Sequence, residues 1–176
     1  MDLSARFTQD AAAEDWSHDY FDPAGLRWGC ARVARIYVES WNLGFGQLMP
    51  PLVFDDNRIN RWAADLTTGR TKWWVAENDG SLAGFVGIGP SRDPVDPELG
   101  ELDTIAVDPG HWRTGIGTTL MQTALKALID DGFPQAILWT LARYDRGQRF
   151  YESTGWNPDG GTRDDGHQMS YRHTLR

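Results

Sequence analysis

The sequence predicts one domain of mixed α/β class, built around a sheet. Apolar residues recur first with helical spacing and then in strand-like runs, in the order helix, helix, three strands, helix, strand, helix, two strands. The length of 176 residues suits a single domain with its own core. An apolar fraction of 40 % argues against a disordered chain, which could not bury enough surface to offset its entropy.

The first segment, residues 1–24, is expected to be an N-terminal extension to a domain at residues 25–176. It is polar and weakly patterned, with at most one short strand at residues 3–8. Pro23 and Gly25 mark its end, because both residue types interrupt regular structure.

Two helices and a hairpin are expected in the next third of the chain. Residues 26–41 and 54–66 each place apolar side chains along one helix face. Residues 72–77 and 82–88 are expected to pair as strands, since the Asn-Asp-Gly sequence between them tolerates the positive φ of a tight turn.

The remaining elements follow a proline-rich stretch, residues 90–97, which is expected to be a loop. The clearest helix has a continuous apolar stripe and is followed by Gly132. The expected elements here are a strand at 98–107, that helix at 115–131, a buried strand at 136–141, a short helix at 145–153, and strands at 156–159 and 168–174.

Charge and composition exclude several classes of protein. A net charge of −8 argues against nonspecific binding to nucleic acid, which needs clustered Lys and Arg. No run approaches the roughly 18 apolar residues of a membrane helix, and the first residues do not resemble a signal peptide. The single cysteine, Cys30, excludes an internal disulfide and a Cys-rich zinc site. We therefore expect a cytoplasmic protein without a metal ion.

The segment most informative about chemistry is residues 102–120, where a strand leads into a glycine-bearing loop that opens a helix. The first turn of a helix leaves backbone N–H groups without partners, and its dipole favours negative charge there. Gly115 and Gly117 would let a phosphate approach the backbone closely, and Arg113 would add a cation. The pattern predicts a pyrophosphate site, unless the two glycines serve only to pack the helix against the strand.

Two common nucleotide-binding motifs do not fit this segment. A P-loop requires a lysine after its last glycine, and none follows Gly117. The dinucleotide-binding fingerprint requires a third glycine where Leu120 stands.

The run V-D-P-G-H-W-R-T-G-I-G-T-T-L instead resembles the acetyl-CoA-binding motif of the GNAT superfamily of N-acetyltransferases. A later run, F-Y-E-S-T-G-W, is similar to that family's Phe-Tyr-x-x-x-Gly-Phe ending, with Phe150, Tyr151 and Gly155 in the matching positions. Two positions depart from the family pattern. Trp112 stands where Gln or Arg is usual, and Tyr144 stands where the family often has Asn.

The resemblance implies the family's fold, a mixed and mostly antiparallel central sheet that is splayed at the cofactor site and flanked by about four helices. It also implies acetyl-CoA as co-substrate and direct acetyl transfer to an amine, with Tyr151 protonating the departing thiolate. The cofactor contacts that it implies are Ile105, Ala106, Val107, Arg113, Thr114, Gly115, Ile116, Gly117 and Thr118.

A base is needed because an amine attacks only when it is neutral. Glu101 is the first candidate, since many family members carry a carboxylate in a similar context, and Asp103 is the second. The third alternative is that no protein group serves as a dedicated base. The strand period of two would place residues 101, 103, 105 and 107 on one face. His111, in the loop, is expected to be a surface residue.

Acceptor binding in this family implies a role for the first two helices and their link. The candidates are Trp41 and Phe45, which could instead only pack the helices, together with Asp103 and the neighbouring Asn42 and Met49. Residues 91–98 are also candidates, and their acidic groups together with the net charge favour a cationic acceptor. A run of arginines would meet the 3′-phosphate of CoA or form a solvated helix face: Arg143, Arg146 and Arg149.

The expected function is therefore acetyl transfer from acetyl-CoA to a primary amine of a small, cationic acceptor. Two alternatives stay open: an acyl-CoA-binding regulatory module without catalysis, and an acetyltransferase acting on protein N-termini or lysines. No nucleic-acid or membrane partner is expected, and a homodimer would be in keeping with the family.

Overall fold

The structure is a computed structural model that describes residues 7–9, 23–67, 69–78 and 80–175. Side-chain surroundings are described from residue 29 onward within these ranges. The expected extension at residues 1–24 and the strand expected at residues 3–8 therefore fall largely outside the described residues.

The described helices begin and end close to where the sequence predicts them, except that the first is longer at both ends. They are α1 (Pro23–Phe45), α2 (Asp56–Thr67), α3 (Ile116–Asp130) and α4 (Asp145–Ser153), with one 3-10 turn, η1 (Pro109–His111), ahead of α3. Within the part of the chain that the structure describes, no helix has the length and apolar character needed to cross a bilayer.

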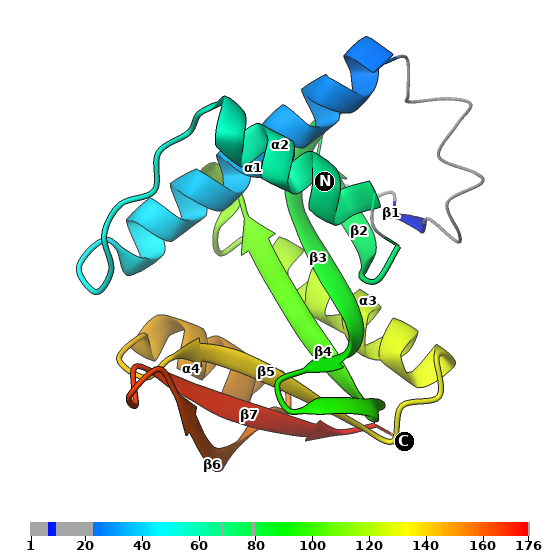
Figure 1. Ribbon diagram of the computed structural model, residues 1–176, viewed down its shortest axis with the longest axis vertical. Coiled ribbons are helices and arrows are strands. Elements are labelled where there is room, and N and C mark those ends of the chain that lie inside the picture. The colour runs from blue at the N-terminus through cyan, green and yellow to red at the C-terminus, as the bar shows by residue number, and fades with distance from the viewer. Residues whose placement is uncertain (1–6, 10–22, 68, 79, 176) are drawn as a thin grey trace.

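The strands form one twisted sheet (Figure 1). They are β1 (Phe7–Gln9), β2 (Lys72–Asn78), β3 (Ser81–Arg92), β4 (Val95–Val107), β5 (Gln135–Leu141), β6 (Asn157–Arg163) and β7 (Gln168–Thr174). Their order across the sheet is β1-β2-β3-β4-β5-β7-β6. Neighbouring strands are antiparallel except β4 and β5, which are parallel. The expected mixed, mostly antiparallel sheet is confirmed.

The parallel contact between β4 and β5 is short. Only residues 99–101 of β4 pair with residues 135–137 of β5. Beyond Glu101 the two strands diverge, as Figure 1 shows, so the sheet is splayed at its centre. This confirms the splay that the family resemblance implied.

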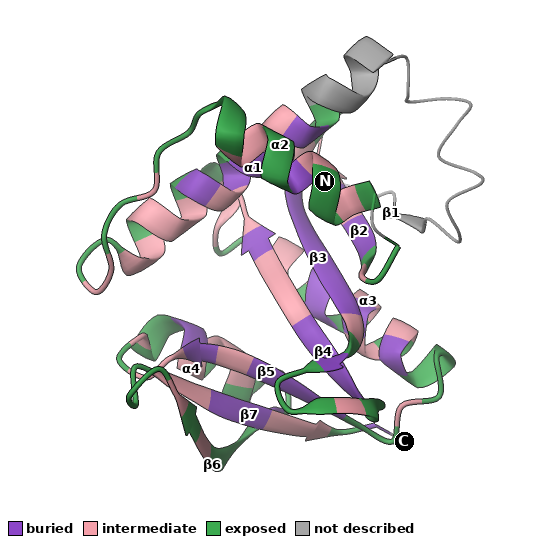
Figure 2. Cartoon of the chain, in the orientation of Figure 1, coloured by how far each residue is buried: buried purple, intermediate pink, exposed green. Residues whose placement is uncertain are grey.

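Helices cover both faces of the sheet, with a separate apolar cluster on each. One cluster joins α1 and α2 to the sheet through Val33, Trp62, Trp73 and Phe85. The other, larger cluster holds α3, and α4 packs against it; Leu120, Met121 and Trp156 are among its buried members. The buried segments in Figure 2 concentrate in β3, in the part of β4 nearest to β5, and in the middle of β5 and β7.

The prediction of a loop at residues 90–97 is wrong. Strands β3 and β4 continue through this stretch and meet in a tight turn at Asp93 and Pro94. Ser91 pairs with Asp96, and the Ser91 hydroxyl donates a hydrogen bond to the carbonyl oxygen of Pro94 (2.7 Å), which closes the turn. Prolines are tolerated here because the end of this hairpin is not a central, doubly paired strand.

The prediction that residues 101, 103, 105 and 107 share one face of the strand is also wrong. Gly87 of β3 pairs with Thr104 while Ile88 pairs with Leu102, so Asp103 is an extra residue, a β-bulge. The bulge reverses the alternation: Leu102 and Ile105 both pack against the α3 cluster although they are three residues apart. Asp103 is thereby placed beside Thr104 on the wall of a cavity on the opposite face.

Candidate active site

The splay leaves one edge of β4 without a partner strand. From residue 102 to residue 107, β4 pairs with β3 on one side only. At the end of this edge, the Val107 carbonyl oxygen accepts a hydrogen bond from Trp112 Nε1 (2.7 Å). The backbone groups of Ile105 and Ala106 lie on the unpaired stretch. An extended ligand can therefore add to this edge as a strand would, through main-chain hydrogen bonds.

A set of backbone N–H groups lies directly after this edge. Asp108 begins η1 by accepting a hydrogen bond from Gly110 N through its side chain (2.7 Å). The first hydrogen bond of α3 runs from Thr119 N to Gly115 O (3.0 Å). Among the described residues, none accepts a hydrogen bond from the backbone N–H groups of residues 113–118. Together with the helix dipole, these free N–H groups could bind an anion such as a phosphate.

The two glycines of the loop differ in what they do. Gly115 has φ +96°, a left-handed conformation that a side chain would strain. A Cβ added to Gly117 would lie 3.6 Å from the Phe150 ring and 3.7 Å from Val107, which is ordinary contact. Packing within the chain therefore does not require glycine at position 117. Close packing of the helix on the strand does not explain this glycine. The free N–H groups of this loop have the chemistry that a pyrophosphate requires.

Trp112, the departure from the family motif, is held between the loop and α4. Its ring lies under the guanidinium of Arg146, whose Cζ is 3.8 Å from the ring centroid, in a cation–π contact. With its indole N–H bound to Val107 O, this side chain fixes the end of β4 to the start of α4. All three of Arg143, Arg146 and Arg149 are exposed, and Arg146 stacks on Trp112.

Tyr151 lies on α4, half-buried against the core behind β5. Its side chain shares a hydrogen bond with Thr140, which lies in the part of β5 that no longer pairs with β4. Burial raises the pKa of the Tyr151 phenol above its ordinary value, and the hydrogen bond with Thr140 only partly opposes this. The hydroxyl is therefore protonated at neutral pH and can act as a donor near the splay.

Glu101 and Asp103 are bound to the same guanidinium, that of Arg92. Glu101 is 5 % exposed and accepts hydrogen bonds from Arg92 N (2.8 Å) and Arg92 Nη2 (3.0 Å). Arg92 Nη2 also contacts Asp103 Oδ1. Burial raises the pKa of Asp103, while the positive charge of Arg92 lowers it. Of the two carboxylates, Asp103 lines the cavity next to this cluster.

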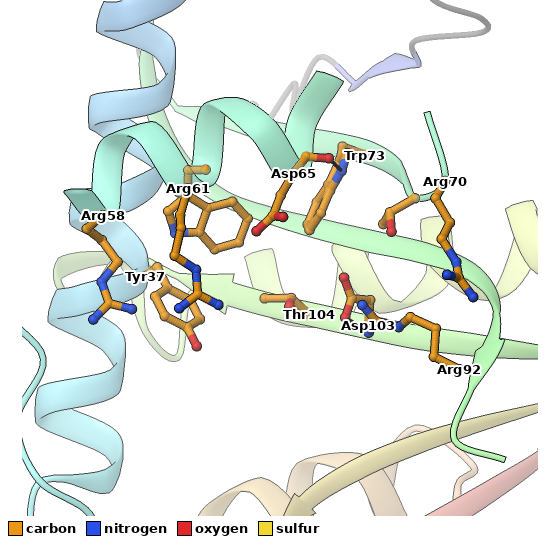
Figure 3. A pocket seen from close by; sticks show the side chains of 11 residues that line it. Tyr37, Arg58, Arg61, Asp65, Arg70, Trp73, Arg92, Asp103 and Thr104 are labelled. Atoms are coloured by element: carbon orange, nitrogen blue, oxygen red, sulfur yellow. Dashed lines mark hydrogen bonds and ion pairs between the residues drawn. The ribbon is translucent and has the colours of Figure 1, made fainter. Parts of the chain in front are cut away.

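That cavity has a volume of about 380 Å³ and opens in front of β3 and β4, between the sheet and helices α1 and α2 (Figure 3). Its size is within the range of roughly 300–1,000 Å³ that is typical of small-molecule sites. Its lining residues are Tyr37, Arg58, Arg61, Trp62, Asp65, Arg70, Thr71, Trp73, Arg92, Asp103 and Thr104.

Among these lining residues, the sequence predicted Asp103 and, within residues 91–98, Arg92, but not the arginines of α2. Tyr37 lies in the helix predicted at residues 26–41 and was not a candidate site residue. The available signal was the polar face of α2, where Arg58, Arg61 and Asp65 recur at helical spacing. From residues 91–98, Arg92 alone contributes to the described lining; the acidic Asp93 lies instead against Arg163 (3.4 Å).

Trp41 and Phe45, expected at the acceptor site, lie further along α1 and are not among the residues that line this cavity. Trp41 Nε1 donates a hydrogen bond to Pro50 O (3.3 Å), and the side chain of Asn42 binds both backbone groups of Leu52. These contacts fix the link between α1 and α2. Met49 lies half-buried in that link.

Phe45 has a further contact, across the splay. Its ring lies 4.4 Å from that of Tyr144, which precedes α4. Rings along α1 continue this row, with Trp41 at 4.8 Å from Phe45 and Tyr37 at 5.9 Å from Trp41. The row connects the α1–α2 cluster with the far half of the sheet. Tyr144, which replaces the family's usual Asn, serves here as a packing contact of α1.

Comparisons with known proteins agree with this architecture. A sequence model of the acetyltransferase (GNAT) family matches residues 30–156. N-acetyltransferase family 8 member 3 of Rattus norvegicus is 30 % identical over 89 residues, which are 50 % of this chain and 39 % of that protein. Phosphinothricin N-acetyltransferase of Streptomyces viridochromogenes is 29 % identical over 116 residues, 65 % of this chain and 63 % of that protein. The matches thus span less than two thirds of these relatives.

A solved structure extends the similarity to nearly the whole chain. PaiA N-acetyltransferase from Thermoplasma acidophilum, in complex with coenzyme A, superposes with a TM-score of 0.67. The match covers 98 % of this chain and 99 % of that one at 15 % identity, so it bears on the fold alone.

Proposed function

Because the chain belongs to the GNAT family of acetyltransferases, we propose that it transfers an acetyl group from acetyl-CoA to a primary amine of a small molecule. The observation that supports this most strongly is the joint position of the unpaired β4 edge and the N–H groups that follow it. An extended arm on the edge and a pyrophosphate at the start of α3 are what one CoA-like ligand would need.

Acetyl-CoA would be held by this chain at two places. The backbone of Ile105, Ala106 and Val107 would pair with its extended arm, and the N–H groups of residues 113–118 would bind its pyrophosphate. When bound, it supplies an activated thioester that an amine can attack. Residues 25–176 would make up the transferase domain.

The proton of the amine would be taken at the Glu101–Arg92–Asp103 cluster. Glu101 is the base that the sequence favours, but it is buried beneath Arg92 with several hydrogen bonds already made. Asp103 stands on the cavity wall, and its raised pKa makes it a stronger proton acceptor than an ordinary aspartate. We therefore propose that Asp103 is the base and that Glu101 positions the Arg92 side chain through its hydrogen bonds.

Tyr151 would donate a proton to the thiolate that leaves when the amide bond forms and the C–S bond breaks. Its hydroxyl is protonated at neutral pH because burial raises its pKa, and it lies beside the unpaired part of β5. Transfer of this proton prevents the thiolate from attacking the product, and solvent returns the proton to the tyrosine.

Two measurements test the proposed function. Calorimetric titration of the full chain with acetyl-CoA should show saturable binding, and a free-thiol assay across a panel of primary amines should show CoA release with some of them. Binding without thiol release for any amine would favour the alternative of an acyl-CoA-binding regulatory module. No binding would refute both.

A tyrosine pair tests the assignment of the acid. Y151F should lower kcat by roughly 10²–10⁴-fold, the usual contribution of a general acid, with little change in the KM for acetyl-CoA. Y171F is the matched control, because Tyr171 lies in the same group of rings but its hydroxyl contacts Glu152 instead (3.2 Å). Equal rates for Y151F and Y171F would show that Tyr151 is not the acid.

A further inference from the structure

The cavity beside Asp103 carries a charge opposite to that of the protein. Its described lining contains four arginines and two aspartates, so its formal charge is 4 − 2 = +2. The whole chain has a net charge of −8. A hollow lined by one sign of charge concentrates ligands of the other sign. The lining therefore favours an anionic group, which the overall composition does not suggest.

The arginines are not equivalent. Arg92 is neutralised by Glu101 and Asp103. Arg58 and Arg61 have no ion pair with any residue that the structure describes. The two arginines are three residues apart on α2. Their side chains point into the same end of the cavity, as Figure 3 shows. Like charges at this spacing repel each other, so an anion held by both would relieve the repulsion.

A third donor lies at the same end. The Tyr37 hydroxyl lies beside the two guanidinium groups in Figure 3 and makes no hydrogen bond within the described part of the chain. Burial raises the pKa of this phenol, and the positive charges of Arg58 and Arg61 oppose the rise, which reflects their proximity. Two guanidinium groups and one hydroxyl match the acceptor oxygens of a carboxylate or a similar oxyanion.

Asp103 lies away from this end, next to Arg92 and Thr104 (Figure 3). A ligand with an amine at Asp103 and an anionic group at α2 would satisfy both parts of the cavity. Resting on the proposed function, we infer that the acceptor carries a carboxylate or another oxyanion in addition to its amine, and that Arg58 and Arg61 bind this group. The acceptor is then an amino-acid-like zwitterion rather than a simple cationic amine.

The test compares amines that differ only in the anion. The probes are glycine, β-alanine, γ-aminobutyrate and L-alanine, each against its own carboxamide, at saturating acetyl-CoA with the free-thiol assay. For at least one pair, kcat/KM should be roughly 10- to 100-fold higher for the acid, the value of one or two charge-assisted hydrogen bonds. The carboxamides have the more readily deprotonated amine, so intrinsic reactivity works against this result.

The variants R58Q and R61Q should each reduce this acid-to-amide ratio, and the double variant should bring it close to one. Gln is chosen because it preserves the helix propensity of α2. R61K should retain part of the preference, because lysine keeps the charge but loses the planar fork. R32Q, an exposed arginine on α1 outside the cavity, is the control and should keep the full ratio. Calorimetric acetyl-CoA binding reports whether each variant is folded.

Each result decides between the two proposals. Turnover of amides and acids with equal kcat/KM in the wild type would overturn the inference but leave acetyl transfer standing. A strong preference for acids that survives in the double variant would overturn the role of Arg58 and Arg61. If no amine releases CoA, calorimetric binding of the four acids still decides: binding that R58Q and R61Q abolish would support the anion site, and no binding would refute it.

Discussion

Removal of the Arg92 side chain, for example by R92M, should destabilise the protein well beyond the loss of a surface ion pair. Glu101 is only 6 % exposed at its side chain, whereas Arg92 is 44 % exposed. Breaking a buried pair costs about 3–5 kcal/mol and breaking an exposed one about 0–1 kcal/mol. With one partner buried and the other half-exposed, we expect a loss of about 2–3 kcal/mol.

Urea unfolding near neutral pH measures this loss, and the m-value should stay unchanged. For a domain of this size, each kcal/mol lowers Tm by roughly 2–4 °C, so thermal unfolding should show a fall of roughly 4–12 °C. K126M is the matched control, since Lys126 and its partner Asp130 are 75 % and 58 % exposed. Its cost should stay below about 0.5 kcal/mol.

The pH dependence of R92M gives a second check. Burial raises the pKa of Asp103, and Arg92 opposes this, so its removal raises that pKa further. An acid with a raised pKa in the folded state contributes stability below its unfolded pKa, and this contribution is lost as pH rises through the folded pKa. The destabilisation by R92M should therefore be smaller at about pH 4 than near pH 7. A double variant, R92M/E101L, should recover much of the loss, because no buried charge is then left unpaired.

Two results would contradict this prediction: a cost of R92M no greater than that of K126M, or a lower stability of R92M/E101L than of R92M alone. Either result would mean that Arg92 does not compensate the buried charge of Glu101.

Three further predictions concern single positions. Burial raises the pKa of Tyr151, so its ionisation should not lower kcat below about pH 10. Y151F should therefore leave the shape of the kcat–pH profile below about pH 10 unchanged. G115A should raise the KM for acetyl-CoA, because Gly115 has φ +96° at the phosphate loop, whereas G80A, with φ +73° in a distant turn, should cost stability but leave that KM unchanged. G87A should destabilise the fold by at least about 1–3 kcal/mol in urea unfolding, because a Cβ there would lie 2.4 Å from the buried ring of Trp73.

The parts of the candidate site that could be placed from the sequence are those that depend on local pattern. The strand, the glycine loop and the helix from residue 102 onward are contiguous in the chain, so the unpaired N–H groups at the start of α3 could be placed without knowledge of the fold. Tyr151 followed from its motif, although its contact with Thr140 on β5 needed the packing of α4.

The parts that failed depend on pairing between distant segments. The bulge at Asp103 exists only because β4 has one residue more than β3 between two paired positions, and no local signal marks it. The prolines of residues 90–97 look like a loop until the pairing of Ser91 with Asp96 is known. Arg58 and Arg61 have the pattern of a solvated helix face, and only the packing of α2 against β2 and β3 turns that face toward a cavity.

The aromatic row along α1 has a consequence for the width of the opening between β4 and β5. The two halves of the sheet are joined by the short parallel contact at residues 99–101, and Phe45 meets Tyr144 on the other side of the opening. A Cβ on Gly44 would lie 3.1 Å from the Tyr144 hydroxyl, so α1 already approaches this ring as closely as its side chains allow. If acetyl-CoA binds along β4 as proposed, the width available to its arm is set partly by the size of residues 44 and 144. Substitutions at residues 44 and 144 should therefore change the affinity for acetyl-CoA, although the proposed contacts with its arm lie on β4.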